Sequence, residues 1–393
     1  MAENKVMTPQ EFYLKVNLKE NPFRSNPVYG VDPRMSIWVG YEKQRNDLMK
    51  FLMRSLADQV GNINFVMIYG DYGVGKSHAL LWARHQITHD QKEQFQSLCY
   101  LIPTLRKDKG KLTFAGAFAD DLVAKTGLRQ DALDYRQFLR FCIGRYQEAN
   151  GLSASIRDEN LIDLLITPVE LNRLAKDLYR QETVEQVEAL LLSSSETDYQ
   201  ATTTFTRLVN LFVFGIEIKG ETRRFRKAVY LMIDELDDLL RASVKEAREI
   251  NDILRHIYDG CPTCFGLAIA LSAEHSNMPA IFEEYILQRI QRQILLEQLG
   301  KDDAMEFVLQ ILETSRIKVD ASKKGYFPFE QAAIEAVVSQ MRQITPRKII
   351  NTMQQVIEEI RLAGFDPSKG KVDLQFLDAH NILDEVLGDG GVV

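Results

Sequence analysis

The segment GDYGVGKS, residues 70–77, constrains the fold of this chain more than any other feature. Gly70, Gly73 and Gly75 fit the pattern G-x-x-x-x-G-K-[ST], in which a backbone without side chains lets successive N–H groups converge on phosphate oxygens. An apolar run of strand length, NINFVMIY (62–69), precedes the loop, and SHALLWARHQI follows it with helical spacing. The sequence therefore predicts a strand, a phosphate-binding turn and a helix, in that order.

Two side chains of this loop have predicted roles of their own. We expect the ammonium group of Lys76 to reach the β- and γ-phosphates of a nucleotide, and the hydroxyl of Ser77 to bind a Mg²⁺ ion that bridges them. The expected ligands are therefore ATP or ADP with Mg²⁺. The loop residues predicted to line the phosphates are Gly70, Asp71, Tyr72, Gly73, Val74, Gly75, Lys76, Ser77 and His78.

A second apolar strand, AVYLMIDELDDLL (228–240), ends in a pair of acids. In this pattern Asp234 supports the Mg²⁺ ion through water, and Glu235 polarises the water that attacks the γ-phosphate. A third buried run, CFGLAIALSAEH (264–275), also ends in polar residues. Ser272 is the candidate there for sensing the γ-phosphate and orienting that water. Together these residues predict hydrolysis of the nucleotide and not binding alone.

Length and composition indicate an ordinary globular chain. Its 393 residues, 45% hydrophobic and 26% charged, suffice to bury a sizeable core. We expect neither a membrane span nor export, because no apolar run approaches ~18 residues and MAENKVMTPQEF lacks a hydrophobic signal region. The expected location is the cytoplasm, which the small number of cysteines also fits. Cys261 and Cys264 form a lone CPTC, which indicates a turn before a strand more than a zinc site.

The net charge of −7 argues against a protein that coats nucleic acid with its whole surface. Any such contact must be local, and LRKDKGK (105–111) is the main candidate segment. Closely spaced flexible cations there are suited to the phosphate backbone of DNA; they are Arg106, Lys107, Lys109 and Lys111. The alternative is a solvated hairpin or loop. A second basic cluster, ETRRFRK (221–227), is interpreted as a soluble connection to the acidic strand.

Roughly 160 residues separate the two nucleotide motifs, and most of them have helical periodicity. Short connections are usual between neighbouring strands, so this length predicts a large helical insertion into the nucleotide-binding domain. The predicted divisions are an irregular or helical segment (1–36), an α/β domain (37–299) with its insertion at about 112–217, a helical lid (300–364) and a short tail (365–393).

Taken in order, the motifs resemble an AAA+ ATPase of the origin-initiator-like branch, which is similar also to transposition-regulator ATPases and to STAND ATPases. They are Val39-Gly40-Tyr41-Glu42, the phosphate loop, LMIDELDD, ALSAEH, the arginines Arg289 and Arg292 before ILLEQL, and Pro346-Arg347 at the start of a helix. This resemblance implies a P-loop fold of three α/β/α layers around a parallel sheet, followed by an α-helical lid.

The resemblance also implies roles for residues outside the phosphate motifs. Val39 and Gly40 are expected beside the adenine, and Arg347 is the expected sensor arginine that reaches the γ-phosphate from the lid. Arg292, or else Arg289, is the expected arginine finger, which inserts into the site of a neighbouring subunit and ties hydrolysis to assembly. A homo-oligomer, a ring or a filament, is the expected partner arrangement.

Three functional classes remain open from the sequence. The preferred one is an ATPase that assembles with ATP on DNA or on a DNA-bound partner, as initiators and transposition regulators do. The alternative is a STAND-like signalling or antiphage switch whose helical insertion and lid bind proteins and not DNA. The third is a motor that threads a substrate through a ring, which the absence of an aromatic pore motif in 105–111 disfavours.

Overall fold

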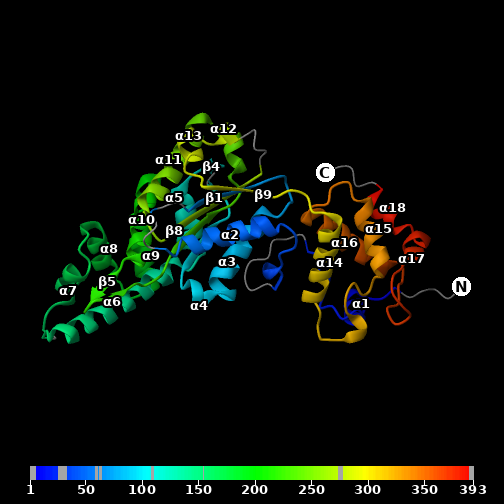
Figure 1. Ribbon diagram of the computed structural model, residues 1–393, viewed down its shortest axis with the longest axis horizontal. Coiled ribbons are helices and arrows are strands. Elements are labelled where there is room, and N and C mark those ends of the chain that lie inside the picture. Colours follow the sequence, from blue (N-terminus) through cyan, green and yellow to red (C-terminus); the bar gives the residue numbers. More distant parts are fainter. Residues whose placement is uncertain are drawn as a thin grey trace. The chain divides into compact units, whose positions relative to one another are not determined.

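The computed structural model describes residues 6–24, 33–57, 61, 64–107, 110–153, 155–272 and 278–388. The chain divides into two compact units (Figure 1). The sheet unit holds Asn46–Gly70 and Ala83–Leu295, and the lid unit holds Met1–Arg45, Asp71–Trp82 and Leu296–Val393. In the described ranges, no helix has both the length and the apolar character that a membrane span needs.

The sheet unit is built on five parallel strands, in the order β2-β7-β8-β1-β9. Four of them are buried along their whole length, which is why their sequences are unbroken apolar runs and do not alternate. The strands are β1 (Phe65–Tyr69), β2 (Leu98–Ile102), β7 (Val229–Ile233), β8 (Phe265–Leu271) and β9 (Arg292–Leu295). The predicted α/β class with a parallel sheet is confirmed.

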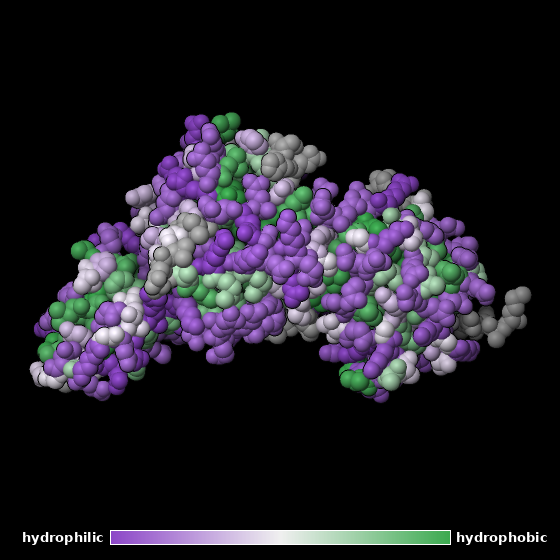
Figure 2. Space-filling view, in the orientation of Figure 1, coloured by the Kyte–Doolittle hydropathy of each residue, from purple (hydrophilic) through white to green (hydrophobic). Residues whose placement is uncertain are grey.

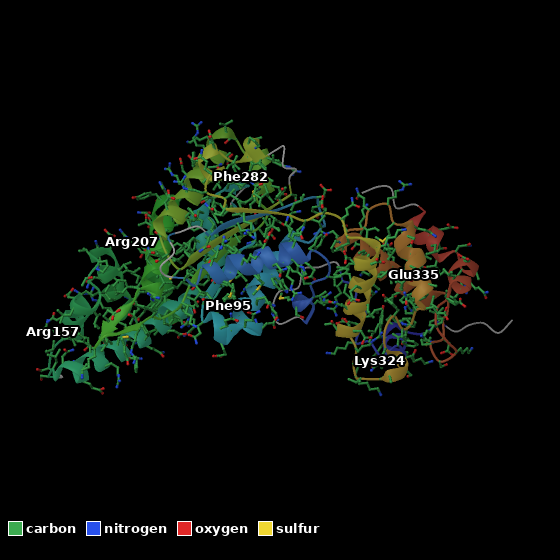
Figure 3. The ribbon with its side chains drawn as sticks, viewed as in Figure 1. Phe95, Arg157, Arg207, Phe282, Lys324 and Glu335 are labelled. Carbon is green, nitrogen blue, oxygen red and sulfur yellow. The ribbon has the colours of Figure 1, made fainter. Side chains whose placement is uncertain are left out.

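Helices cover both faces of this sheet. On one face, the ring of Phe205 in α10 (Asp198–Val213) lies 6.4 Å from that of Phe265 on β8. On the other face, Tyr230 of β7 contacts Phe51 of α2 (Glu42–Arg54) and Phe95 of α4 (Lys92–Phe95), with ring centroids 6.1 Å and 6.3 Å apart. Phe95 is labelled in Figure 3. Successive side chains of a strand point to opposite faces, so these contacts fix three layers. The predicted α/β/α arrangement is confirmed.

Between β2 and β7 the chain forms a succession of helices, as the periodicity predicts. Arg207 of α10, labelled in Figure 3, pairs with Glu170 of α8, which ties the two helices together. Figure 2 shows apolar colour gathered over α7 and α8. The helices of this segment are α5 (Phe114–Ala117), the π-helical turn η3 (Phe118–Val123), α6 (Leu128–Asn150), α7 (Asp158–Leu165), α8 (Val169–Tyr179), α9 (Val184–Ser193) and α10. The predicted large helical insertion is confirmed.

Two short antiparallel hairpins also lie in this segment; a hairpin or loop was the alternative for the first, and a connection to the acidic strand was expected at the second. The first joins β3 (Arg106–Lys107) to β4 (Lys111–Leu112), and the second joins β5 (Ile216–Ile218) to β6 (Glu221–Arg223). In the second, Lys219 and Gly220 both have positive φ, 51° and 83°, which is the backbone of a tight two-residue hairpin turn. Strands of two or three residues carry too little periodicity to be recognised in advance.

The remaining helices of the sheet unit come after the phosphate loop, after the acids at 234 and 235, and after β8. The helix α3 (Lys76–His85) begins in the lid unit and ends in the sheet unit. After it come the π-helical turn η2 (Gln86–Asp90), α4, the 3-10 helix η4 (Leu236–Arg241), α11 (Val244–Gly260), α12 (Met278–Ile281) and α13 (Glu284–Leu287).

The lid unit has a hydrophobic core of its own, to which both terminal regions contribute. Phe12 and Val16 of the N-terminal region and Leu377 and Ile382 of the C-terminal region are all at most 1% exposed in it. Its helices are α1 (Pro9–Lys15), η1 (Pro33–Ser36), α14 (Lys301–Thr314), η6 (Ala321–Lys323), α15 (Gln331–Gln340), α16 (Pro346–Leu362), α17 (Leu374–Ala379) and α18 (Ile382–Leu387). The predicted α-helical lid is confirmed, while the predicted domain boundaries remain a prediction.

Candidate functional site

The loop between β1 and α3 has the backbone that a phosphate cradle requires. Gly70, Gly73 and Gly75 have φ values of 145°, 85° and 106°, a region that residues with a side chain rarely adopt. Because α3 begins at Lys76, the free N–H groups of its first turn lie directly after this loop. Amide donors at a helix N-terminus, with no side chains in the way, are suited to bind phosphate oxygens. The residues present therefore fit the phosphate groups of a nucleotide.

Lys76 is held inside this loop. Its side chain is buried, with 7% of the residue exposed, and its Nζ atom donates a hydrogen bond of 2.7 Å to the main-chain oxygen of Asp71. This hydrogen bond closes the turn between Asp71 and Lys76. Ser77, the next residue, is exposed. The roles predicted for Lys76 and Ser77 remain predictions.

The predicted sensor arginine lies against the same loop, within the lid unit. The main-chain N–H of Arg347 donates to the oxygen of Gly73 at 3.3 Å, and its guanidinium carbon lies 4.1 Å from the centre of the Tyr72 ring. A Cβ atom on Gly73 would lie 3.1 Å from the Cβ atom of Arg347, so the glycine permits this approach. The position is set by Thr345, which caps the N-terminus of α16 through a hydrogen bond to the N–H of Lys348.

The predicted adenine-side residues lie in a tightly packed turn of the lid unit. Val39 is buried. Gly40 has a φ of 64°, and a Cβ atom at this residue would lie only 2.9 Å from the carboxylate of Asp303. His78 helps to hold the preceding segment, since its Nε2 atom lies 2.7 Å from the oxygen of Ile37. Burial lowers the pKa of the His78 imidazole, which favours a neutral ring that donates to this carbonyl. The adenine contact of Val39 and Gly40 remains a prediction.

The paired acids leave the sheet at the end of β7. The N–H of Asp234 donates to the oxygen of Ile102 on β2 at 2.9 Å, and the N–H of Glu235 donates to the Asp234 carboxylate at 2.9 Å. Glu235 is exposed and has a φ of 52°, in the left-handed region. Such a backbone is costly for a residue with a side chain, and residues of this kind concentrate at functional sites.

Ser272 directly follows β8, the strand that neighbours β7 in the sheet. Because the two strands are parallel, Ser272 and the paired acids leave the same edge of the sheet. Glu274 and His275, the other polar residues expected at this strand end, lie outside the described residues. The water-orienting role of Ser272 remains a prediction.

Both candidate finger arginines form ion pairs within their own chain. Arg292, at the start of β9, pairs with Asp47 of α2. Arg289 makes a two-bond contact with Asp259 of α11, with N–O distances of 2.9 Å and 2.8 Å. Either arginine must exchange a carboxylate partner before it can serve a neighbouring subunit, and the finger assignment remains a prediction.

The basic segment LRKDKGK is partly engaged within the chain. Arg106 pairs with Asp238 of η4 at 3.0 Å, so the structure commits one of the four predicted phosphate-contacting cations to an internal ion pair. Lys111 is exposed on β4. Lys109 lies outside the described residues, as does the side chain of Lys107. The DNA contact remains a prediction for this hairpin.

The cysteines and histidines carry no metal site in the part of the chain that the structure describes, where no group of three potential ligands converges. Cys261 and Cys264 are buried, and burial raises the pKa of the Cys261 thiol. They lie in the turn before β8, as expected. Four contacts of the predicted site residues could not be predicted, because each partner is far away along the chain. The partners are Asp47, Asp238, Asp303 and the ring of Tyr72.

No protein-family model matches the sequence, and no curated protein matches it. Among solved structures, the chain is similar to the Aeropyrum pernix ORC2 protein in its ADPNP–ADP complexes, with 12% identity and a TM-score of 0.49 over 94% of this chain and 71% of that one. A Walker-type ATPase of Pyrococcus abyssi shares 14% identity, with a TM-score of 0.44 over 91% and 75% of the two chains. Domain III of the Thermotoga maritima replication initiation protein DnaA shares 10% identity, with a TM-score of 0.42 over 92% and 99%. The likeness to these proteins is one of fold class.

Proposed function

We propose that this chain is an AAA+ ATPase that binds and hydrolyses ATP, and that ATP drives its assembly on DNA or on a DNA-bound partner. The observation that carries the proposal is the contact of Arg347 with the phosphate loop, at Gly73 and Tyr72. The guanidinium rests on the Tyr72 ring beside a loop suited to phosphate oxygens, so a triphosphate bound in that loop would attract it electrostatically.

In the proposed reaction, the loop amides and Lys76 bind the β- and γ-phosphates. Glu235 accepts the proton of the attacking water, Ser272 orients that water, and Arg347 neutralises charge on the γ-phosphate. Ser77 and Asp234 are the residues proposed to hold Mg²⁺, which supplies positive charge to the phosphate oxygens when it is bound. A hydroxyl and a carboxylate are the oxygen donors that this ion prefers.

A switch that binds a protein partner and no DNA is the second candidate. It is favoured by exposed apolar side chains on the helical insertion: Leu164 of α7 is 59% exposed and Val169 of α8 is 82% exposed. Exposed apolar side chains that gather in a patch often mark protein contacts. ATP turnover that stays constant across single-stranded DNA, duplex DNA and no DNA would favour this candidate.

Duplex DNA is expected to raise ATP turnover or the size of the ATP-bound assembly, and the effect is expected to fade as salt rises. The reason is that contacts between lysines and phosphates release counterions, which makes them strongly salt-dependent. Charge reversal at Lys107, Lys109 and Lys111 should remove the response. The measurement is phosphate release, together with light-scattering mass, with ADP, ATP and a slowly hydrolysed analogue at two salt concentrations.

Charge reversal at three lysines of the lid unit provides the matched control, since it changes the net charge equally. Suitable residues are Lys318, Lys323 and Lys324. A DNA response that disappears equally in both triple variants would contradict a local contact at the hairpin.

Arg292→Ala is expected to preserve ATP affinity and to lower turnover in the assembled protein by roughly a thousandfold, as loss of an arginine finger does. Arg289→Ala is the control, because it also removes an ion-paired arginine, one bound to Asp259. Turnover and mass are measured on the same samples. Normal turnover of Arg292→Ala within an assembly would remove this residue as the finger, and a defect confined to Arg289→Ala would transfer the role.

A further inference from the structure

The side chain of Arg347 lies on an aromatic ring of the phosphate loop. Its guanidinium carbon is 4.1 Å from the centre of the Tyr72 ring, well within the distance of a cation–π contact. Both residues belong to the lid unit, so the contact lies within one compact part of the chain. The arginine that is expected to reach the γ-phosphate therefore binds a ring of the loop itself.

The backbone of Arg347 is fixed beside this loop independently of the ring. Its N–H donates to the oxygen of Gly73 at 3.3 Å, and the buried Thr345 caps the first turn of α16. Directly before that cap, the oxygen of Ile344 accepts the N–H of Leu299 at 2.8 Å. The guanidinium can therefore move between the ring and a phosphate by rotation of its own side chain, without a displacement of α16.

The ring contact is open to solvent, which makes it weak and readily exchanged. Tyr72 is 73% exposed, and Arg347 is exposed as well. A cation on an aromatic ring at such a site is held less strongly than one that makes charge-assisted hydrogen bonds to phosphate oxygens. A γ-phosphate within reach can thus take the arginine. ADP has no γ-phosphate and is expected to leave the arginine on the ring.

We infer that Tyr72 sets the preference of this site for ATP over ADP, by holding Arg347 on its ring until a γ-phosphate takes the arginine. The inference rests on the proposed function, in which Arg347 neutralises charge on that phosphate. Breaking the ring contact costs free energy only when ATP binds, so the contact lowers the affinity for ATP and not that for ADP. Tyr72 is thereby a positioning residue, which determines nucleotide specificity through Arg347.

The test is the ratio of the affinity for a slowly hydrolysed ATP analogue to that for ADP, measured by isothermal titration of the full chain with Mg²⁺. Tyr72→Leu is expected to raise this ratio about two- to fivefold, because no ring then holds the arginine. Tyr72→Trp is expected to lower the ratio, since indole provides the strongest cation–π face. Tyr72→Phe keeps a ring and is expected to restore most of the contact that leucine removes.

A double variant and a control separate this effect from a general change in the loop. In the background of Arg347→Gln, Tyr72→Leu is expected to have no effect on the ratio, because the two residues act through one contact. Tyr199→Leu is the matched control, since it removes a tyrosine of α10 that is 71% exposed and belongs to the sheet unit. Thermal melting of every variant checks that the fold is retained.

Each result supports or overturns the inference. A ratio that Tyr72→Leu leaves unchanged or lowers would overturn it, as would an equal effect of Tyr72→Leu with and without Arg347. If Arg347→Gln alone binds both nucleotides with the wild-type ratio, the inference fails together with the proposed role of this arginine, while nucleotide binding stands. If wild type binds neither nucleotide, the proposed function itself fails, and the inference fails with it.

Discussion

Lys76→Ala is expected to lower the affinity for ATP by about a hundredfold or more. Each charge-assisted hydrogen bond contributes roughly 1.5–3 kcal/mol, and the buried ammonium group is expected to reach two phosphates. Removing it also leaves the oxygen of Asp71 without the donor that now closes the loop. Isothermal titration with ATP and with ADP measures the loss for each nucleotide.

The control for this variant is Lys92→Ala, which removes an exposed lysine at the start of α4. It should bind ATP as wild type does. Because the alanine at residue 76 lies at the start of a helix, where alanine is well tolerated, we expect little change in thermal stability. An affinity within threefold of wild type would show that the loop does not hold the phosphates in this way.

Glu235→Gln is expected to keep ATP affinity while turnover falls by roughly 100- to 10,000-fold, the range for loss of a general base. The amide has the shape of the carboxylate and cannot accept the proton of the attacking water. The ATP-bound assembly should therefore persist, and sizing with ATP should show the larger species after times at which wild type has reverted. Phosphate release and light scattering measure the two effects.

Glu249→Gln serves as the control, because it neutralises an exposed glutamate of α11 in the same unit. It should hydrolyse ATP at the wild-type rate. If Glu235→Gln also hydrolysed at that rate, another residue would have to activate the water.

The core of the fold was readable from the sequence because buried parallel strands leave a strong signal. Runs such as those ending in Tyr69 and Leu271 are apolar at every position, and the structure buries every residue of β1 and β8. The hairpin of Arg106 and Lys107 had no comparable signal, because each strand is two residues long. Local patterns identify elements in proportion to their length.

The sequence predicted the parts of the candidate site that lie within one continuous segment of the chain. The phosphate loop and the acids at 234 and 235 each follow a strand directly, so their positions depend on local sequence alone. The partner of Arg106 is 132 residues away along the chain, and that of Arg292 is 245 residues away. Tertiary packing determines which acidic residue forms an ion pair with each arginine. Composition shows only that acidic and basic residues are both present.

The two arginines of the proposed mechanism differ in how firmly they are held. Arg347 rests on the face of an exposed tyrosine, a contact that contributes about 0.5–1 kcal/mol at such sites. Arg292 rests on a carboxylate, Asp47, within hydrogen-bonding reach. In the proposed mechanism, a bound triphosphate has to displace only the ring contact of Arg347. Arg292 has to leave Asp47 before it can reach the site of a neighbouring subunit. In that mechanism, nucleotide binding would precede the association of subunits, because the contact of Arg347 is easier to break than the ion pair of Arg292.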